Sequence, residues 1–161
     1  MLTPRYIETE SRVDSRMGHR RSPTLTCLLA RTFRSDSQAP GSARRALKSL
    51  NGSIDPALAD DVRLLVSELV TNSLRHTGST SVDLEVWRSD DVVRVSVCDH
   101  GAGFEVTGPP RPGKASGWGL FMVDRLADRW GVETNGDTRV WFEFLRAGAR
   151  RRDGALFDTA S

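Results

Sequence analysis

The clearest pattern in this chain is the alternation of apolar and polar residues in its second half. Apolar side chains occupy every second position over 82–86 and again over 93–97, and the polar residues 89–91 stand between the two runs. A period of two places alternate side chains on opposite faces of a strand, so these runs predict a β-hairpin. A second hairpin is predicted over 130–145, where the Asn-Gly-Asp sequence at 135–137 favours a tight turn.

The middle of the chain changes to a helical period. Apolar residues recur every three or four positions over 58–69, which predicts one long amphipathic helix. Asp55 is suited to the N-cap and Pro56 to the first helical position. Gly78 follows the predicted end of the helix at His76, as expected of a residue that closes a helix.

The remaining segments give shorter elements. Residues 24–33 predict a first strand, 35–41 a turn and 43–50 a short helix. Residues 104–116 are rich in proline and glycine and predict a loop, which leads into another helix over 117–128.

The predicted order of elements is strand, two helices, two strands, helix and two strands. Because hairpins dominate over parallel crossovers, this order predicts an α+β fold: a two-layer sandwich with a mixed, mostly antiparallel sheet and helices on one face. Residues 23–146 are expected to form this domain. Residues 1–22 and 147–161 are basic, contain few apolar residues and are expected to be flexible tails.

Composition narrows the class of protein. The chain has 161 residues, of which 38% are hydrophobic and 27% charged, as in ordinary globular domains. A net charge of +2 is too small to favour nucleic acid as a partner, and no apolar run approaches the roughly 20 residues of a membrane span. Cys27 and Cys98 both fall in predicted strands and are expected to be buried free thiols, so the cysteine content does not support a metal site.

Three short segments carry candidate chemistry. Glu68 and Asn72 lie one turn apart at the border of the apolar stripe of the long helix, where polar groups are costly unless something satisfies them. Asp99 follows the second strand of the first hairpin, and Gly101 and Gly103 would let the backbone pass close to a ligand. Taken singly, each is ordinary: the first pair suits a solvated helix rim, and the second group suits an Asp-rich turn.

The third segment opens the last predicted helix. Gly117 and Gly119 there would expose backbone N–H groups at the positive end of the helix dipole, which suits phosphate binding. Taken singly, this pair suits a glycine-rich hinge. Three unrelated coincidences in this order are less probable than one shared nucleotide site.

In these three segments the chain resembles the GHKL superfamily, whose ATP-binding domain is called the Bergerat fold and which includes gyrase, MutL, heat-shock chaperones and histidine kinases. The likeness covers residues 24 to 145. The sequence around Glu68 (LVSELVTNS) and the stretch GLFMVD at 119–124 are most similar to the small RsbW-like anti-sigma-factor serine kinases.

The resemblance implies a role for each matching residue of the first two segments. Glu68 would be the catalytic carboxylate that positions and deprotonates the attacking hydroxyl. Asn72 would bind ATP and hold Mg²⁺ beside the phosphates. Asp99 would accept a hydrogen bond from the adenine amino group, and Gly101 and Gly103 would allow close approach of the base.

The resemblance also assigns the third segment. Gly117, Gly119 and Leu120 would bind the nucleotide, the glycines through backbone N–H groups to the phosphates, and residues 104–116 would cover it as a lid. Trp118 departs from the family, which usually has a small or basic residue between the two glycines.

Two functions therefore remain open. The first is a cytoplasmic ATP-dependent serine/threonine-protein kinase that phosphorylates a serine of a STAS-type anti-anti-sigma partner and sequesters a sigma factor, in keeping with related kinases that are commonly homodimers. The second is a nucleotide-dependent binding module of the same fold without phosphotransfer activity, which Trp118 favours. A detached histidine-kinase domain is disfavoured because no dimerisation helix with a phospho-accepting histidine is recognisable upstream.

Overall fold

The computed structural model describes residues 24–101 and 118–146. The chain order of the elements is the predicted one, and their bounds are β1 Thr26–Arg34, α1 Ala39–Lys48, α2 Pro56–His76, β2 Ser81–Arg88, β3 Val92–Asp99, α3 Trp118–Leu126, β4 Arg129–Thr134 and β5 Thr138–Leu145. The two predicted tails, 1–22 and 147–161, lie outside the described residues, as do Gly103, Gly117 and the predicted 104–116 loop.

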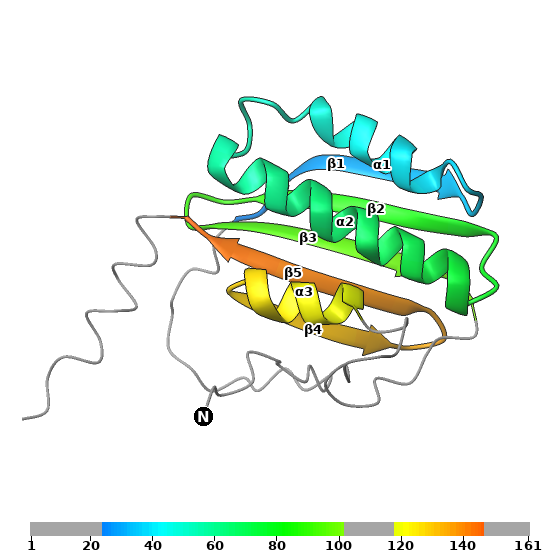
Figure 1. Ribbon diagram of the computed structural model, residues 1–161. Helices are drawn as coiled ribbons and strands as arrows, with labels where there is room; N and C mark the ends of the chain where they lie inside the picture. The colour runs from blue at the N-terminus through cyan, green and yellow to red at the C-terminus, as the bar shows by residue number, and fades with distance from the viewer. Residues whose placement is uncertain (1–23, 102–117, 147–161) are drawn as a thin grey trace, which may run out of the picture.

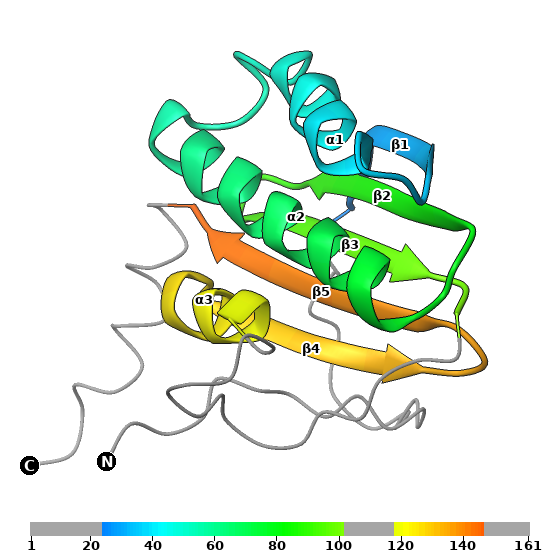
Figure 2. The ribbon, with the colours of Figure 1, turned by 45° about the vertical axis from the view of Figure 1, so that its right-hand side comes forward.

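The five strands form one sheet in the order β1-β2-β3-β5-β4, and every pairing between them is antiparallel. The three helices lie on one face of this sheet, with α2 crossing the middle and α3 lying over β5 and β4 (Figure 1). This arrangement confirms the predicted α+β sandwich. Placing β5 next to β3 puts the end of β3 at the centre of the sheet, beneath the end of α2 (Figure 2).

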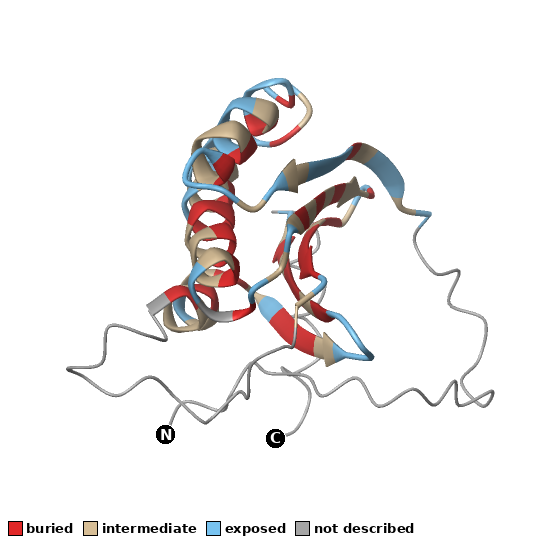
Figure 3. Ribbon diagram, turned by 90° about the vertical axis from the view of Figure 1, so that its right-hand side faces the viewer, coloured by how far each residue is buried: buried red, intermediate tan, exposed pale blue. Residues whose placement is uncertain are grey.

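The core fills the space between α2 and the sheet. Leu65 and Val66 of α2 are fully buried, as are Val95 of β3 and Phe142 of β5. Buried positions follow the helical period on α2 and the period of two on β2, where Val82, Leu84 and Val86 alternate with half-buried neighbours. In Figure 3 the buried residues of both layers face each other across this space.

Both ends of α2 are as predicted. The Asp55 carboxylate accepts the N–H of Ala57 at 2.9 Å, and Pro56 occupies the first turn, where its missing N–H costs nothing. At the other end Thr77 is the C-cap, and Gly78 takes a φ of +63°, a conformation that residues with a side chain rarely adopt. These signals fix where α2 begins and ends.

The predicted bounds of α1 were wrong. The helix begins at Ala39, four residues before the predicted start at 43 and inside the predicted turn, and it ends at Lys48. Pro40, which suggested a turn, lies in the first turn of the helix, where proline is tolerated. Ala39 itself is buried and belongs to the core.

The prediction for Cys27 was also wrong. Cys27 is exposed because β1 is an edge strand, and Leu29 is its one buried residue. Cys98, on the central strand β3, is a buried free thiol as predicted. None of the described helices is both long enough and apolar enough to span a lipid bilayer.

Candidate functional site

The first part of the candidate site lies on the side of α2 that faces α3. Glu68 and Asn72 are both half-buried, next to the buried Leu65 and Leu69. Their place at the border of the apolar stripe, predicted from the helical period, is confirmed. Because Leu65 and Leu69 pack α2 against the sheet, the backbone that carries the Glu68 carboxylate and the Asn72 amide has a fixed position relative to the sheet.

Gly119, the second residue of α3, lies directly against these two side chains. A Cβ atom built on Gly119 would collide with the Asn72 amide nitrogen and would lie 3.6 Å from the Glu68 Cβ. A side chain at residue 119 would therefore displace the Asn72 amide. The contact places the start of α3 beside Glu68 and Asn72.

The second part of the site is at the end of β3. Asp99 is only 4% exposed, and its carboxylate accepts the Gly101 N–H at 3.1 Å. Burial raises the pKa of Asp99 above its usual range, while the Gly101 N–H and the neighbouring Thr77 and Ser73 hydroxyls partly offset this by favouring the charged form. A buried carboxylate whose pKa is raised by burial is a candidate for a functional site.

The hydroxyl groups beside Asp99 come from the last turns of α2. The Thr77 hydroxyl donates its hydrogen bond to the Ser73 carbonyl oxygen at 2.8 Å. The Ser73 hydroxyl is buried and has no hydrogen-bond partner among the described residues. Since buried polar groups are normally paired, the surroundings of Asp99 have unused hydrogen-bonding capacity.

Gly101 packs against the end of α2. A Cβ atom there would collide with the Thr77 carbonyl oxygen and would lie 2.6 Å from the Thr77 Cβ. Its φ is not positive, so the glycine is needed for this close contact and not for an unusual turn. The expected role of Gly101, close approach to a ligand, is not tested by this contact.

Helix α2 joins the two parts. Glu68 and Asn72 contact Gly119, and one turn further along the same helix Ser73 and Thr77 lie beside Asp99 and Gly101. Leu120, next to Gly119, is half-buried against the core. The predicted site residues that the structure describes therefore lie along one helix, between the end of β3 and the start of α3.

Sequence reasoning missed Ser73 and Thr77. They follow Asn72 on α2, and Ser73 lies one turn before Thr77, but serine and threonine near a helix end are too common to stand out. Only the position of Asp99 beneath this turn shows that they belong to the site.

Sequence reasoning also missed a polar region on the opposite face of the sheet. A hollow of about 360 Å³ lies there, lined in part by Trp87, Arg94 and Trp141. The Arg94 guanidinium stacks 4.4 Å from the centre of the Trp141 ring, and Arg139 donates to Glu85 at 3.1 Å. Because side chains alternate along β3, this hollow faces away from α2 and from the site residues.

One family of known proteins matches a stretch of the chain that contains both parts of the site. Residues 33–144 match the family described as the histidine kinase-like ATPase domain, from the end of β1 to the end of β5. This range includes Glu68, Asn72, Asp99 and Gly119. No curated protein matches the chain.

Proposed function

Because the chain belongs to the histidine kinase-like ATPase domain family, an ATP-binding module of the GHKL type, we propose that the site along α2 binds Mg–ATP and transfers its γ-phosphoryl group to a serine or threonine of a protein partner. The observation that carries this proposal is the contact of Gly119 with Asn72 and Glu68. It brings a helix N-terminus, an amide and a carboxylate to one place, as transfer of a phosphoryl group requires.

The environment of Asp99 fits an adenine ring. Its buried carboxylate is an acceptor, and the Ser73 hydroxyl beside it lacks a partner among the described residues. Adenine presents a donor amino group next to an acceptor ring nitrogen. We assign the amino group to Asp99, and Ser73 or a bound water molecule completes the pairing.

The start of α3 fits the phosphates. Backbone N–H groups of the first helical turn have no partners within the helix, and the helix dipole favours negative charge there. Gly119 adds no side chain between this helix end and the Asn72 amide. Gly117 and Gly103, which lie outside the described residues, are assigned to the same site by the resemblance alone.

Asn72 is the residue proposed to hold Mg²⁺. Its amide oxygen is a hard ligand, and Mg²⁺ keeps most of its waters and takes few protein ligands. When bound, the ion would neutralise charge on the phosphate oxygens. Its close approach to Gly119 puts the Asn72 amide beside the start of α3.

Glu68 is the proposed catalytic residue. Its carboxylate accepts the proton of the attacking serine hydroxyl as the new P–O bond forms on the serine oxygen. The bond between the γ-phosphorus and the bridging oxygen breaks, and ADP leaves with that electron pair. General-base assistance of this kind contributes about 10²- to 10⁴-fold to a rate.

The proposed partner is a STAS-type anti-anti-sigma protein, and the proposed circuit includes a sigma factor. The resemblance suggests Arg44 or Arg45, on the short first helix, as a contact for such a partner. Arg44 of α1 is exposed, and its guanidinium donates to the Ser67 hydroxyl at 3.2 Å, next to Glu68 in the chain. This supports Arg44 as the residue that would meet a protein presenting its serine to Glu68.

The second candidate function is a nucleotide-dependent binding module that does not transfer phosphate. Trp118, the first residue of α3, favours it because a bulky residue stands where relatives have a small or basic one. Both functions share the same nucleotide site, so they differ in turnover and not in binding.

The test has two stages. First, calorimetry with ATP and MgCl₂ should show saturable binding that Asp99→Asn weakens strongly. Second, incubation with γ-labelled ATP and the STAS-type proteins of the source organism should label one of them on serine or threonine. Glu68→Ala should retain ATP binding and lose labelling.

Asp60→Asn is the matched control, because Asp60 is a carboxylate on the same helix whose side chain is 89% exposed and remote from the site. It should bind and label like the parent chain. ATP binding without any labelling would favour the binding module. Absence of ATP binding would overturn both functions.

A further inference from the structure

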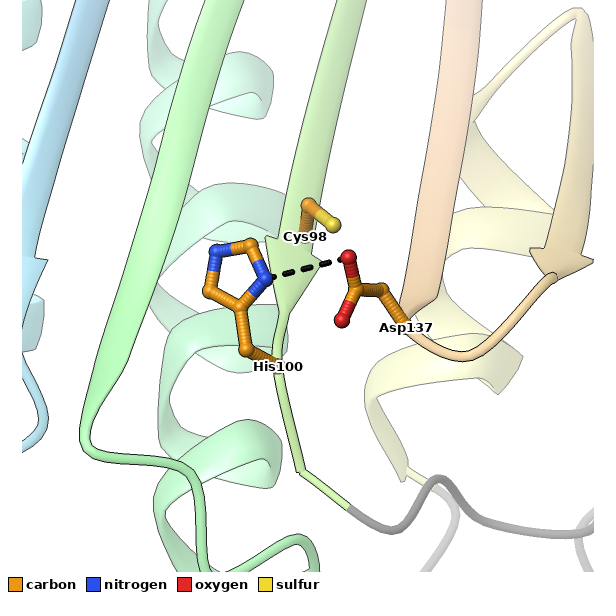
Figure 4. Close-up of side chains that lie close together, drawn as sticks. All are labelled: Cys98, His100 and Asp137. Atoms are coloured by element: carbon orange, nitrogen blue, oxygen red, sulfur yellow. Dashed lines mark ion pairs between the residues drawn. The ribbon is translucent and has the colours of Figure 1, made fainter.

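Three potential metal ligands meet at the end of the central strand, on the side of the sheet away from the helices. The Cys98 sulfur, a ring nitrogen of His100 and a carboxylate oxygen of Asp137 all lie within 4.8 Å of one another. Figure 4 shows the three side chains directed toward a common space. Cys98 lies near the end of β3, His100 follows two residues later, and Asp137 belongs to the turn between β4 and β5.

His100 has the arrangement that metal-binding histidines usually have. Its Nδ1 lies 3.2 Å from the Asp137 carboxylate, inside the cluster. Its Nε2 lies 2.8 Å from the Asp83 carboxylate, outside the cluster. A histidine that binds a metal through one nitrogen normally donates the other N–H to a carboxylate, which fixes the tautomer and the ring orientation.

Asp83 is itself held in place. Its other carboxylate oxygen accepts a hydrogen bond from the Thr32 hydroxyl at 2.7 Å. Thr32 on β1 thus holds the Asp83 side chain on β2, and Asp83 in turn holds the His100 ring. A contact between His100 and Asp137 alone would not need the outer contacts made by Asp83 and Thr32. The sequence Cys-x-His gives two ligands on the same side of an extended chain, and the β4–β5 turn brings in the third.

An ion pair or a reactive thiol accounts for this cluster less completely. As an ion pair alone, the imidazolium would bridge Asp83 and Asp137, whose carboxylates raise the pKa of His100. The Cys98 sulfur takes no part in that ion pair, and its hydrogen bond goes to the Asp99 carbonyl oxygen at 3.9 Å. As a nucleophile, Cys98 would need a base directed at its sulfur. His100 directs both ring nitrogens to carboxylates rather than to the sulfur.

We propose that Cys98, His100 and Asp137 form a binding site for Zn²⁺, with a fourth position open to water. Zinc is bound by thiolate, imidazole and carboxylate at about 2.0–2.3 Å, so its ligand atoms lie about 3.3–3.8 Å apart in a tetrahedral site. The 3.2 Å between His100 and Asp137 already matches this spacing. Asp137 is half exposed in a turn, so small movements of its side chain can close the site.

This site is separate from the proposed Mg²⁺ site. Cys98 and His100 alternate with Asp99 along the chain, so the zinc ligands and the adenine-binding carboxylate project to opposite sides of β3. The ligand types differ as well: a sulfur and an imidazole select zinc, whereas the Asn72 amide and phosphate oxygens select magnesium.

The test uses the full chain without a histidine tag, after treatment with a chelator. Titration with Co²⁺, as a spectroscopic substitute for zinc, should give one equivalent of binding with a thiolate-to-cobalt charge-transfer band. Zinc should displace the cobalt. Cys98→Ser should abolish the band, and Asp137→Asn should weaken binding at least tenfold.

Matched controls are available in the chain. Cys27→Ser removes the exposed cysteine at the far end of the sheet, and Asp90→Asn removes an exposed carboxylate of the other hairpin turn; neither should change the titration. Asp83→Asn should keep the band and lower the affinity about tenfold, as loss of an outer hydrogen-bond partner does.

Asp137 is exposed, so Asp137→Asn serves as the test even if Cys98→Ser fails to fold. The proposal is overturned if the parent chain shows no thiolate band with cobalt. It is also overturned if Asp137→Asn binds cobalt as tightly as the parent chain does.

Discussion

Gly119 lies so close to Asn72 that a side chain on residue 119 would displace the Asn72 amide. The contact joins the first turn of α3 to the middle of α2, and it places the Glu68 Cβ 3.6 Å from where a Cβ atom of residue 119 would be. Residues from two helices separated by two strands and by residues 102–117 thus share one small space. The proposed phosphate and magnesium contacts both depend on this packing.

Replacing Gly119 by alanine should therefore displace the Asn72 amide and weaken ATP binding. At an open helical position the same change stabilises by up to about 1 kcal/mol, because alanine favours the helix. At Gly119 the Asn72 amide must move aside to make room for the added methyl group, so we expect this gain in stability to be reduced or lost. Calorimetry with ATP and thermal unfolding measure the two effects.

Gly41→Ala is the matched control. Gly41 lies in α1, and a Cβ atom there would be 3.7 Å from its nearest neighbour, the end of an arginine side chain. This variant should unfold at the same or a higher temperature and bind ATP normally. Equal behaviour of the two alanine variants would contradict the close contact at Gly119.

Asp99→Asn should raise the stability of the fold and weaken ATP binding. Burial of the carboxylate raises its pKa, so its charge destabilises the folded chain at neutral pH, and a neutral amide of the same shape removes this cost. We expect stability to rise by about 0.5–2 kcal/mol, as at other functional residues. ATP affinity should fall about 10- to 100-fold, since a hydrogen bond to a charged group contributes about 1.5–3 kcal/mol.

The stability gained by Asp99→Asn should depend on pH. A carboxyl group whose pKa is raised by folding destabilises the fold progressively as pH increases from its unfolded pKa to its folded pKa. The gain in stability of Asp99→Asn should therefore be absent at a pH below the unfolded pKa and present at pH 7. Chemical denaturation at both values measures it. A gain that is equally large at both would argue against burial of the charge as its cause.

Gly101→Ala should be more destabilising than Gly136→Ala. At Gly101 the new Cβ atom would collide with the Thr77 backbone, which cannot be moved without unwinding the end of α2. At Gly136 the space is open and only the positive φ of +86° opposes a side chain, at about 1 kcal/mol. Denaturant unfolding of the two variants should show the larger loss at residue 101.

Zinc and ATP should influence each other if both proposed sites exist. Zinc would tie the end of β3 to the β4–β5 turn, which holds the backbone of Asp99 in place and lowers the cost of ordering it on binding. ATP affinity should then rise about fivefold or more with zinc, and zinc affinity should rise by the same factor with ATP. Asp137→Asn should remove this coupling and leave zinc-free ATP binding unchanged.

The sequence by itself determined the order of the elements, the α+β class and the positions of Glu68, Asn72 and Asp99 on them. These features depend on local rules: a period of two or 3.6, an Asp-Pro helix start and a glycine after the last turn. The same local rules misplaced the start of α1, since Pro40 is equally suited to a turn and to a first helical turn.

The tertiary structure decided which distant residues meet. It set Gly119 against Asn72, Ser73 and Thr77 beside Asp99, and Asp137 beside Cys98 and His100. It also left Cys27 exposed, because strand order, and not the strand's own sequence, makes β1 an edge. Contacts between residues far apart in the chain arise from how the layers pack, and no local period encodes that packing.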